Sequence, residues 1–132
     1  PAVLRSTPSS GAGLLRTEAA PWPLKWPWRC CIGMAAGCWG LFGGHLDPGE
    51  TPEQALRREL LEEISWQPMV VELVMVHHIH RRTAHVFQAE LSVPLEQLQL
   101  LEGQDMALVS PEEMLAGSIW STKLGSHRPL AD

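Results

Sequence analysis

Apolar side chains between residues 51 and 65 recur at helical spacing. Leu56, Leu60 and Ile64 lie four residues apart, and mostly charged or polar residues fill the positions between them. Because an α-helix turns about 100° per residue, side chains at this spacing line one face. The pattern predicts an amphipathic helix over residues 51–65 whose apolar stripe packs against a core.

The start of this helix is marked by residues that satisfy free backbone N–H groups. Thr51 is a suitable N-cap, Pro52 suits the first helical position, and Gln54 completes a Thr-x-x-Gln capping box. Pro68 follows the last apolar position and prevents the helix from continuing. The sequence therefore predicts both ends of the helix.

Other apolar runs have the β-branched content and the short length typical of strands. The runs at 70–79 and 84–93 are joined around the polar stretch His-Arg-Arg-Thr, which predicts an antiparallel pair. Further expected elements are a short strand near 29–34, an extended segment at 39–42, a strand at 106–109 and a second helix beginning at Ser110. Strands combined with two helices predict a mixed α/β domain.

The first 27 residues follow neither a helical nor a strand period. They are rich in Pro, Ser, Gly and Ala, and prolines alternate with tryptophans at the end of the stretch. Proline interrupts both helices and sheet ladders. We therefore expect residues 1–27 to be a flexible or irregular segment and residues 28–132 to form a single domain.

The composition limits the kinds of molecule that the protein is expected to bind. The 132 residues include 15 acidic and 10 basic side chains, a formal net charge of −5. This balance argues against a nucleic-acid surface held by bulk electrostatics, so an anionic substrate would need local help such as a metal ion. No apolar run reaches the length of a membrane span. Cys30, Cys31 and Cys38 form no Cys-x-x-Cys pair, which favours reduced thiols and a cytoplasmic protein.

Three carboxylates are predicted to converge on one side of the helix. Glu59, Glu62 and Glu63 fall within one arc of roughly 100°, and like charges at this spacing repel one another. One interpretation is a solvated face that Arg57 and Arg58 partly neutralise. The other is a site for Mg²⁺ or Mn²⁺, which prefer oxygen ligands. A glycine pair in the preceding loop favours the metal site, because it allows the backbone to approach the carboxylates closely.

The spacing of these residues resembles the Nudix box, the signature motif of the Nudix hydrolases. The motif reads Gly-x5-Glu-x7-Arg-Glu-U-x-Glu-Glu-x-Gly-U, where U is a bulky aliphatic residue. The matching positions here are Gly44, Glu50, Arg58, Glu59, Leu60, Glu62 and Glu63. The chain departs from the motif at Ser65, where the family has glycine, and at Trp66, where it has an aliphatic residue. Neither departure removes an acidic position.

The resemblance implies an α/β/α sandwich with a mixed central sheet on which the box helix packs. It also implies a Mg²⁺-dependent pyrophosphohydrolase, with Mn²⁺ as an alternative ion. The substrate would be a (deoxy)nucleoside triphosphate, or a nucleoside diphosphate linked to another moiety, cleaved by water attack on phosphorus. By the same resemblance, the ligands would be the Gly44 carbonyl and Glu59, Glu62 and Glu63, with Arg58 orienting Glu59 and Glu50 supporting the loop and helix.

Some assignments remain open from the residues alone. The general base is one of the box glutamates or a carboxylate outside the box. Glu102 is a candidate for an extra metal ligand or base, and a surface turn residue is the other reading of it. The alternative function is a non-catalytic Nudix-like module that binds a nucleotide or a protein, although such modules usually lack some of these acids. The resemblance also leaves a homodimer open.

A second cluster of polar residues follows the run at 70–79. In an extended strand His78 and His80 would share one face and His77 the other. Zinc binding, contact with substrate and ordinary sheet surface are the three interpretations of these histidines. Arg81 and Arg82 are expected either in a solvated hairpin turn or in contact with phosphate.

Overall fold

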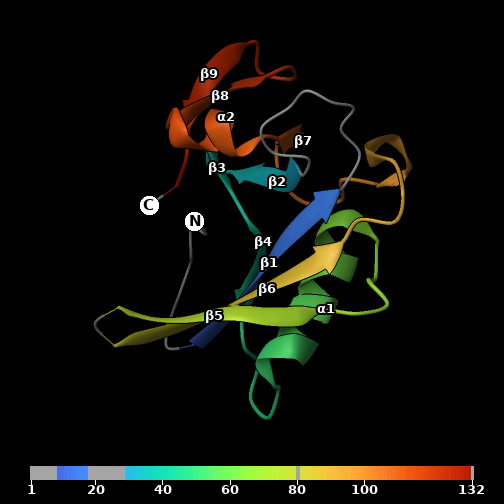
Figure 1. Cartoon of the computed structure of the whole chain (residues 1–132), viewed down its shortest axis with the longest axis vertical. Helices are drawn as coiled ribbons and strands as arrows, with labels where there is room; N and C mark the ends of the chain where they lie inside the picture. The colour runs from blue at the N-terminus through green and yellow to red at the C-terminus, as the bar shows by residue number, and fades with distance from the viewer. Residues whose placement is uncertain (1–8, 18–28, 80, 132) are drawn as a thin grey trace.

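A computed structural model describes residues 9–17, 29–79 and 81–131 of the chain. The elements are β1 (Ser9–Thr17), β2 (Arg29–Ala35), β3 (Cys38–Gly40), β4 (Phe42–His45), α1 (Pro52–Ile64), β5 (Glu72–Ile79), β6 (Arg82–Glu90), the 3-10 helix η1 (Leu95–Gln97), β7 (Asp105–Val109), α2 (Pro111–Leu115), β8 (Ser118–Ser121) and β9 (Ser126–Pro129). The first seven strands form one mixed sheet, and β8 and β9 form a separate hairpin (Figure 1). No helix in the described part of the chain is long and apolar enough to cross a membrane.

The strand β1 lies in the middle of the mixed sheet. Its first half pairs antiparallel with β4, its last residues pair antiparallel with β2, and its length runs parallel to β6. β7 pairs with the other side of β2, and β5 closes the opposite edge by pairing antiparallel with β6. The β5–β6 pair and the strands near 29–34 and 106–109 confirm predictions from the sequence pattern.

The strand β1 corrects the expectation of an irregular segment over residues 1–27. Glycine and serine have low strand propensity, so the local pattern of Ser9–Thr17 does not predict a strand. The hydrogen bonds of two flanking strands stabilise it instead, a contribution that local propensity does not include. Residues 1–8 and 18–28, which include the alternating prolines and tryptophans, lie outside the described residues.

The helix α1 has the predicted ends and the predicted buried face. The Thr51 hydroxyl accepts a hydrogen bond from the Gln54 N–H at 3.2 Å, and the Gln54 side chain accepts from the Thr51 N–H at 2.9 Å. Leu56, Leu60 and Ile64 are buried. They pack in one core with side chains from β4, β6 and the segment around η1, namely Phe42, Phe87, Ala89, Leu91 and Leu98.

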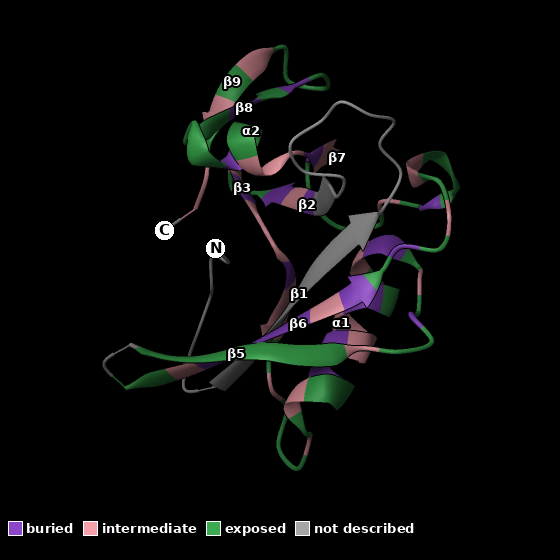
Figure 2. Ribbon diagram, viewed as in Figure 1, coloured by how far each residue is buried: buried purple, intermediate pink, exposed green. Residues whose placement is uncertain are grey.

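The two helices cover opposite faces of the mixed sheet. Side chains alternate along β7: Met106 and Leu108 pack against the α1 core, whereas Val109 belongs to a second core. This second core combines strand residues with Met114 of α2 and Ile119 of β8. Figure 2 shows buried residues on the strands between α1 and α2. The expected α/β/α arrangement with a mixed sheet is confirmed.

The β8–β9 hairpin and α2 are attached to the sheet by buried polar contacts. Asp105 at the start of β7 accepts a hydrogen bond from the Ser121 hydroxyl at 2.7 Å, and both residues are buried. The Trp39 indole N–H donates to the Ile119 carbonyl at 3.0 Å. Ser110 caps α2 with a reciprocal capping box through Glu113, which confirms the predicted start of this helix.

Candidate active site

The box helix lies directly against a glycine of β4. A Cβ built on Gly44 would lie 2.3 Å from Oε1 of Glu59 and 2.5 Å from its Cδ, distances that no real side chain permits. The glycine therefore leaves the space in which the Glu59 carboxylate sits. The contact brings the backbone of β4 next to a carboxylate of α1, which is the close approach expected from the sequence.

Arg58 joins several of the acidic residues. Its guanidinium donates to Glu50 at 2.8 and 3.0 Å, to Glu59 at 2.9 Å and to Glu62 at 3.3 Å. A further bond of 3.0 Å goes to the His45 carbonyl. The hydrogen bonds from Arg58 lower the pKa of Glu50, and the bond to Glu50 raises the pKa of Arg58 itself. Arg58 thus joins the loop to the helix and donates a hydrogen bond to Glu59.

Glu63 is partly buried at the end of α1, next to β4. Its Oε2 accepts a hydrogen bond from the Gly43 N–H at 3.0 Å. Burial raises the pKa of Glu63 to about 7, the Gly43 bond opposes this rise, and the negative charges of Glu59, Glu102 and Glu62 add to it. Negative charge is therefore concentrated at this end of the helix face beyond what Arg58 neutralises.

The loop before β7 brings Glu102 to this cluster. The N–H groups of Leu101 and Glu102 donate to the Glu63 carbonyl at 2.8 and 3.3 Å, which holds the loop against the end of α1. Gly103 adopts a φ of +106°, and a Cβ there would lie 2.7 Å from the Met34 carbonyl. The sequence indicated Glu102 only as a candidate; the tight docking of this loop places it near Glu63.

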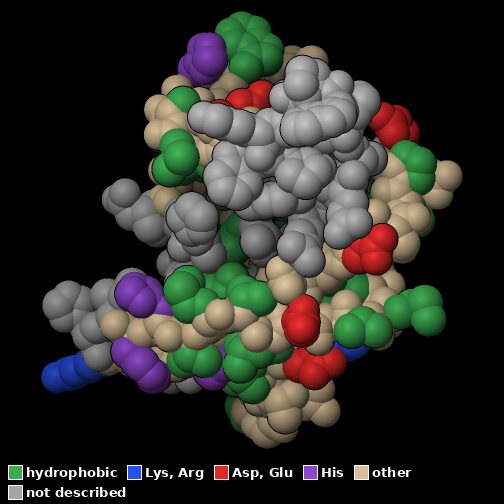
Figure 3. Space-filling model, in the orientation of Figure 1, with side chains coloured by type: hydrophobic (Ala, Val, Ile, Leu, Met, Phe, Trp, Pro, Cys, Tyr) green, Lys and Arg blue, Asp and Glu red, His purple; other side chains and the backbone are tan. Residues whose placement is uncertain are grey.

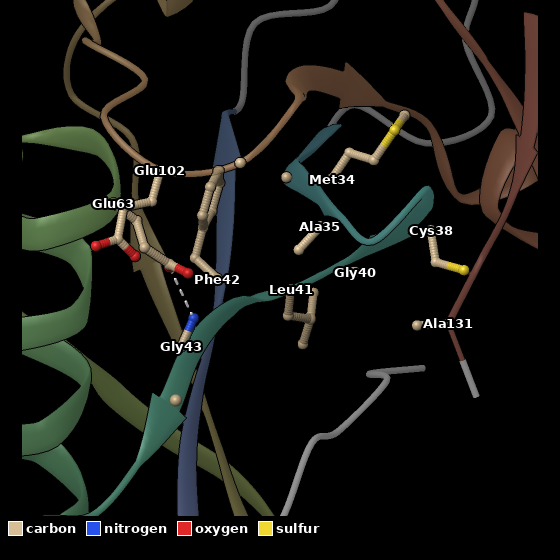
Figure 4. A pocket seen from close by; sticks show the side chains of 13 residues that line it. Met34, Ala35, Cys38, Gly40, Leu41, Phe42, Gly43, Glu63, Glu102 and Ala131 are labelled. Carbon is tan, nitrogen blue, oxygen red and sulfur yellow. Dashed lines mark hydrogen bonds between the residues drawn. The ribbon is translucent and has the colours of Figure 1, made fainter. Parts of the chain in front are cut away.

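A pocket of about 250 Å³ opens beside Glu63. In Figure 4, Glu63, Glu102 and Phe42 lie at one end, while Met34, Cys38 and Ala131 line the other. Gly33, Ala35, Gly40, Leu41, Gly43, Gly44 and Gly103 complete the lining. No local sequence pattern marks these residues as a pocket, because they come from α1, β2, β3, β4, the loop before β7 and the C-terminal end.

The carboxylates of the helix face are the type of donor that a hard divalent cation such as Mg²⁺ prefers. Glu59 supplies carboxylate oxygens beside the backbone of Gly44, Glu63 lies against Gly43, and Glu62 bonds to the same arginine as Glu59. Among the described residues, no three His, Cys, Asp or Glu side chains are gathered tightly enough to surround an ion. The residues therefore fit a divalent cation by donor type, and in the described conformation their carboxylates bond to Arg58 and Gly43.

The histidines predicted as a second cluster lie elsewhere. His77 and His78 are exposed on β5, and Nδ1 of His78 is 3.0 Å from the Thr83 hydroxyl of β6. His80 is not among the described residues. Neither described histidine lines the pocket beside Glu63. Sheet surface is therefore the interpretation that the geometry of these two residues supports.

Comparison with known families identifies the class to which this fold and this carboxylate cluster belong. The model of the NUDIX domain matches residues 17–126. The chain belongs to the Nudix family, as the resemblance of its box implied. The match begins within β1 and ends in β9, so it includes the strands on both sides of the box.

Individual relatives agree with this assignment. The CTP pyrophosphohydrolase of Escherichia coli K12 is 37% identical over 82 residues, which are 61% of this chain and 61% of that protein. The structure of a Caenorhabditis elegans Ap4A hydrolase superposes with a TM-score of 0.65 at 20% identity, covering 81% of this chain and 83% of the other. The NUDIX domain of Shewanella oneidensis NrtR, complexed with ADP ribose, gives a TM-score of 0.68 at 18% identity and covers 97% and 81%. These structural similarities support the fold.

Proposed function

We propose that this protein is a Mg²⁺-dependent pyrophosphohydrolase of nucleotides, with Mn²⁺ as an alternative ion. The observation that carries the proposal is the packing of Glu59 against Gly44, with Glu63 held on the neighbouring Gly43. A bound divalent cation would neutralise the carboxylates and the phosphates together, and would stabilise charge on the leaving phosphate. All acidic positions of the box are present, which supports catalysis over the non-catalytic alternative.

The residues of the chain have separable roles in this proposal. Glu59, Glu62, Glu63 and the Gly44 carbonyl would hold the ion. Arg58 would keep Glu59 directed at it, and Glu50 would hold Arg58 in place through the paired hydrogen bonds described above. Glu102 adds a carboxylate at the mouth of the pocket and is a candidate ligand or base. The base that accepts the proton of the attacking water is one of these glutamates, and single Glu→Gln variants distinguish them.

The pocket and the relatives support a choice of substrates to test first. The apolar lining by Met34, Leu41 and Phe42 suits a nucleobase or ribose, with the phosphates directed toward Glu63. The E. coli relative is named for CTP, and the matched stretch covers 61% of it. We therefore place CTP and dCTP first among the nucleoside triphosphates to be tested.

A substrate panel with and without Mg²⁺ tests the proposal. The panel contains the (deoxy)nucleoside triphosphates, oxidised nucleotides, ADP-ribose, dinucleoside polyphosphates and nucleotide sugars, and products are separated by ion-exchange chromatography. We expect hydrolysis of at least one compound that EDTA stops and added Mg²⁺ restores. Binding of a nucleotide without any hydrolysis would instead support a binding module.

A matched pair of variants separates loss of chemistry from loss of folding. Glu63→Gln keeps an acceptor for the Gly43 N–H and removes the charge, so we expect a folded protein without measurable activity. Glu53→Gln changes a half-exposed glutamate in the first turn of the same helix, which is paired with Arg57. We expect this control to keep near wild-type activity. Equal activity of both variants would contradict the assignment of Glu63.

Two further expectations accompany the proposed activity. A cytoplasmic location is suggested by the cysteine pattern, and Cys38 is a free thiol in the structure. The net charge of −5 supports a small-molecule substrate over a nucleic acid. Cell fractionation checks the location, and competition of hydrolysis by single-stranded and double-stranded nucleic acid checks the substrate class.

A further inference from the structure

The turn between β2 and β3 has a strained backbone. Its two central residues, Ala36 and Gly37, adopt φ values of 53° and 75°. The flanking residues Ala35 and Cys38 are paired across the turn. A positive φ at both central positions is the requirement of a type I′ turn, for which Asn-Gly is a preferred sequence. Alanine carries a Cβ that disfavours this conformation, and such strain persists only where surrounding structure holds the backbone.

The same turn forms the apolar end of the pocket. Ala35 and Cys38 line the pocket toward the end away from Glu63 and Glu102 (Figure 4). In the proposed function this end receives the nucleobase or the ribose, and the phosphates lie toward Glu63. The fit of the nucleoside therefore depends on how firmly the turn is held.

Gln104 holds the turn from a segment far away in the sequence. Its side-chain Oε1 accepts a hydrogen bond from the Gly37 N–H at 2.6 Å. Its own N–H donates to the Met34 carbonyl of β2 at 2.8 Å. Gln104 is not one of the described residues that line the pocket, so any effect it has on a bound nucleotide passes through the turn.

The loop that carries Gln104 also carries Glu102. At its other end the loop is attached to α1, because the N–H groups of Leu101 and Glu102 donate to the Glu63 carbonyl. Figure 3 shows acidic side chains on the side of the molecule that carries the loop between η1 and β7, and basic ones at the tip of the β5–β6 hairpin. Residues 101–104 thus connect the carboxylate end of the pocket to its apolar end through hydrogen bonds.

We propose that Gln104 is a positioning residue for the nucleoside part of the substrate, because it holds the strained turn and so fixes Ala35 and Cys38. This role rests on the proposed function, in which a nucleotide binds with its phosphates at Glu63. Loss of the Gln104 acceptor releases the turn and leaves the backbone hydrogen bonds of Glu102 and Gln104 intact. Nucleoside binding should therefore weaken, while the chemical step at the carboxylates proceeds at its usual rate.

Gln104→Met removes the acceptor and keeps a side chain of similar length. We expect the KM for CTP, or for the nucleotide of the panel that is hydrolysed fastest, to rise about three- to tenfold with kcat unchanged. Inorganic triphosphate lacks a nucleoside, so its inhibition constant against this hydrolysis should be the same in variant and wild type. Steady-state kinetics with Mg²⁺ measures the three constants.

Two further variants should restore the wild-type KM. Gln104→Glu keeps an oxygen acceptor for the Gly37 N–H, and physiological ionic strength screens the added charge. Ala36→Asn gives the turn the favoured Asn-Gly sequence, so it should lower the KM of Gln104→Met although the acceptor is still missing. Gln99→Met is the matched control, because Gln99 is also exposed and bonds the end of α1 through its backbone N–H. Its KM should equal that of the wild type.

Amide exchange in the nucleotide-free protein tests the contact itself. The Gly37 N–H should exchange faster in Gln104→Met and at the wild-type rate in Gln104→Glu. An active wild type whose KM is unchanged by Gln104→Met would overturn the role of Gln104 and leave the proposed function intact. A lower kcat at unchanged KM, or weaker inhibition by inorganic triphosphate, would also overturn it. A wild type that hydrolyses no compound of the panel would overturn the proposed function itself, so the two failures are distinguishable.

Discussion

Gly44 determines where the Glu59 carboxylate lies. Oε1 and Oε2 of Glu59 occupy the volume that a side chain at position 44 would fill. The atoms in conflict belong to the flexible end of a side chain, so a methyl group at this position displaces the carboxylate and leaves the backbone of β4 intact. The consequence for the proposed cation site is a misplaced ligand in a folded protein.

Gly44→Ala should therefore weaken Mg²⁺ binding by about 10- to 100-fold while the melting temperature changes little. Isothermal titration calorimetry with Mg²⁺ measures the first effect and circular dichroism the second. Gly40→Ala is the matched control, because among the described residues a Cβ there meets only the Ala131 Cβ, at 3.9 Å. Unchanged Mg²⁺ affinity in Gly44→Ala would contradict the role given to Glu59.

Glu63 makes the cation-free protein sensitive to pH. Its folded-state pKa of about 7 lies above the ordinary value of 4.5, so the folded state binds this proton more tightly than the unfolded state does. The stability that this tighter proton binding contributes is fully present below pH 4.5 and is lost as the pH rises through about 7. Its size is roughly 3 kcal/mol.

Glu63→Gln should be more stable than wild type at pH 8 in EDTA, by roughly 3 kcal/mol, and close to wild type at pH 5. Urea unfolding at the two pH values measures the difference in the free energy of unfolding. The contributions of the other titrating groups are common to both proteins and cancel. Added Mg²⁺ should stabilise the wild type at pH 8 and not the variant. An equal difference between the two proteins at both pH values would show that Glu63 is not buried as described.

At the scale of elements, α1 ends where the family motif and this chain differ. Ser65 is the C-cap and adopts φ 52° and ψ 41°, the left-handed conformation that glycine adopts at lower cost. Its N–H donates to the Leu61 carbonyl at 3.1 Å, and the Trp66 N–H reaches the Leu60 carbonyl. The backbone turn that the family makes with glycine is thus kept, with a side chain in the less favourable conformation.

Ser65→Gly should raise the free energy of unfolding by about 0.5–1 kcal/mol, because the left-handed penalty of serine exceeds the entropy cost of glycine. Ser65→Ala is the control, since alanine keeps a Cβ in the same conformation and should bring no gain. Chemical denaturation with urea checks both. A loss of stability in Ser65→Gly would mean that the serine side chain makes a stabilising contact.

At the scale of the whole molecule, a buried carboxylate connects two parts of the fold. Asp105 accepts from the Ser121 hydroxyl and from the Lys123 N–H at 3.4 Å, and so holds the β8–β9 hairpin against β7. Asp105→Ala leaves the buried Ser121 hydroxyl without this acceptor. We expect a loss of about 2–3 kcal/mol of stability and faster amide exchange in residues 118–129.

Ser118→Ala provides the comparison, because Ser118 is an exposed residue of the same hairpin. Hydrogen–deuterium exchange followed by mass spectrometry localises the change, and urea unfolding gives its size. Faster exchange spread evenly over the sheet, and not concentrated in the hairpin, would contradict a local attachment through Asp105.

The sequence by itself determined the features that depend on neighbouring residues. The capping box at Thr51 and Gln54, the apolar stripe of α1 and the placement of Glu59, Glu62 and Glu63 on one arc follow from helical geometry alone. The antiparallel β5–β6 pair followed from two β-rich runs around a short turn. These elements have local signals, so they could be predicted.

Tertiary structure decided the features that depend on distant segments. β1 is a strand because β4 and β6 supply its hydrogen bonds, although its glycines and serines disfavour one. Glu102 meets Glu63 because its loop bonds the end of α1, and the pocket forms from strands and loops far apart in sequence. Long-range hydrogen bonds and packing outweigh local propensity at these positions, and no local pattern records them.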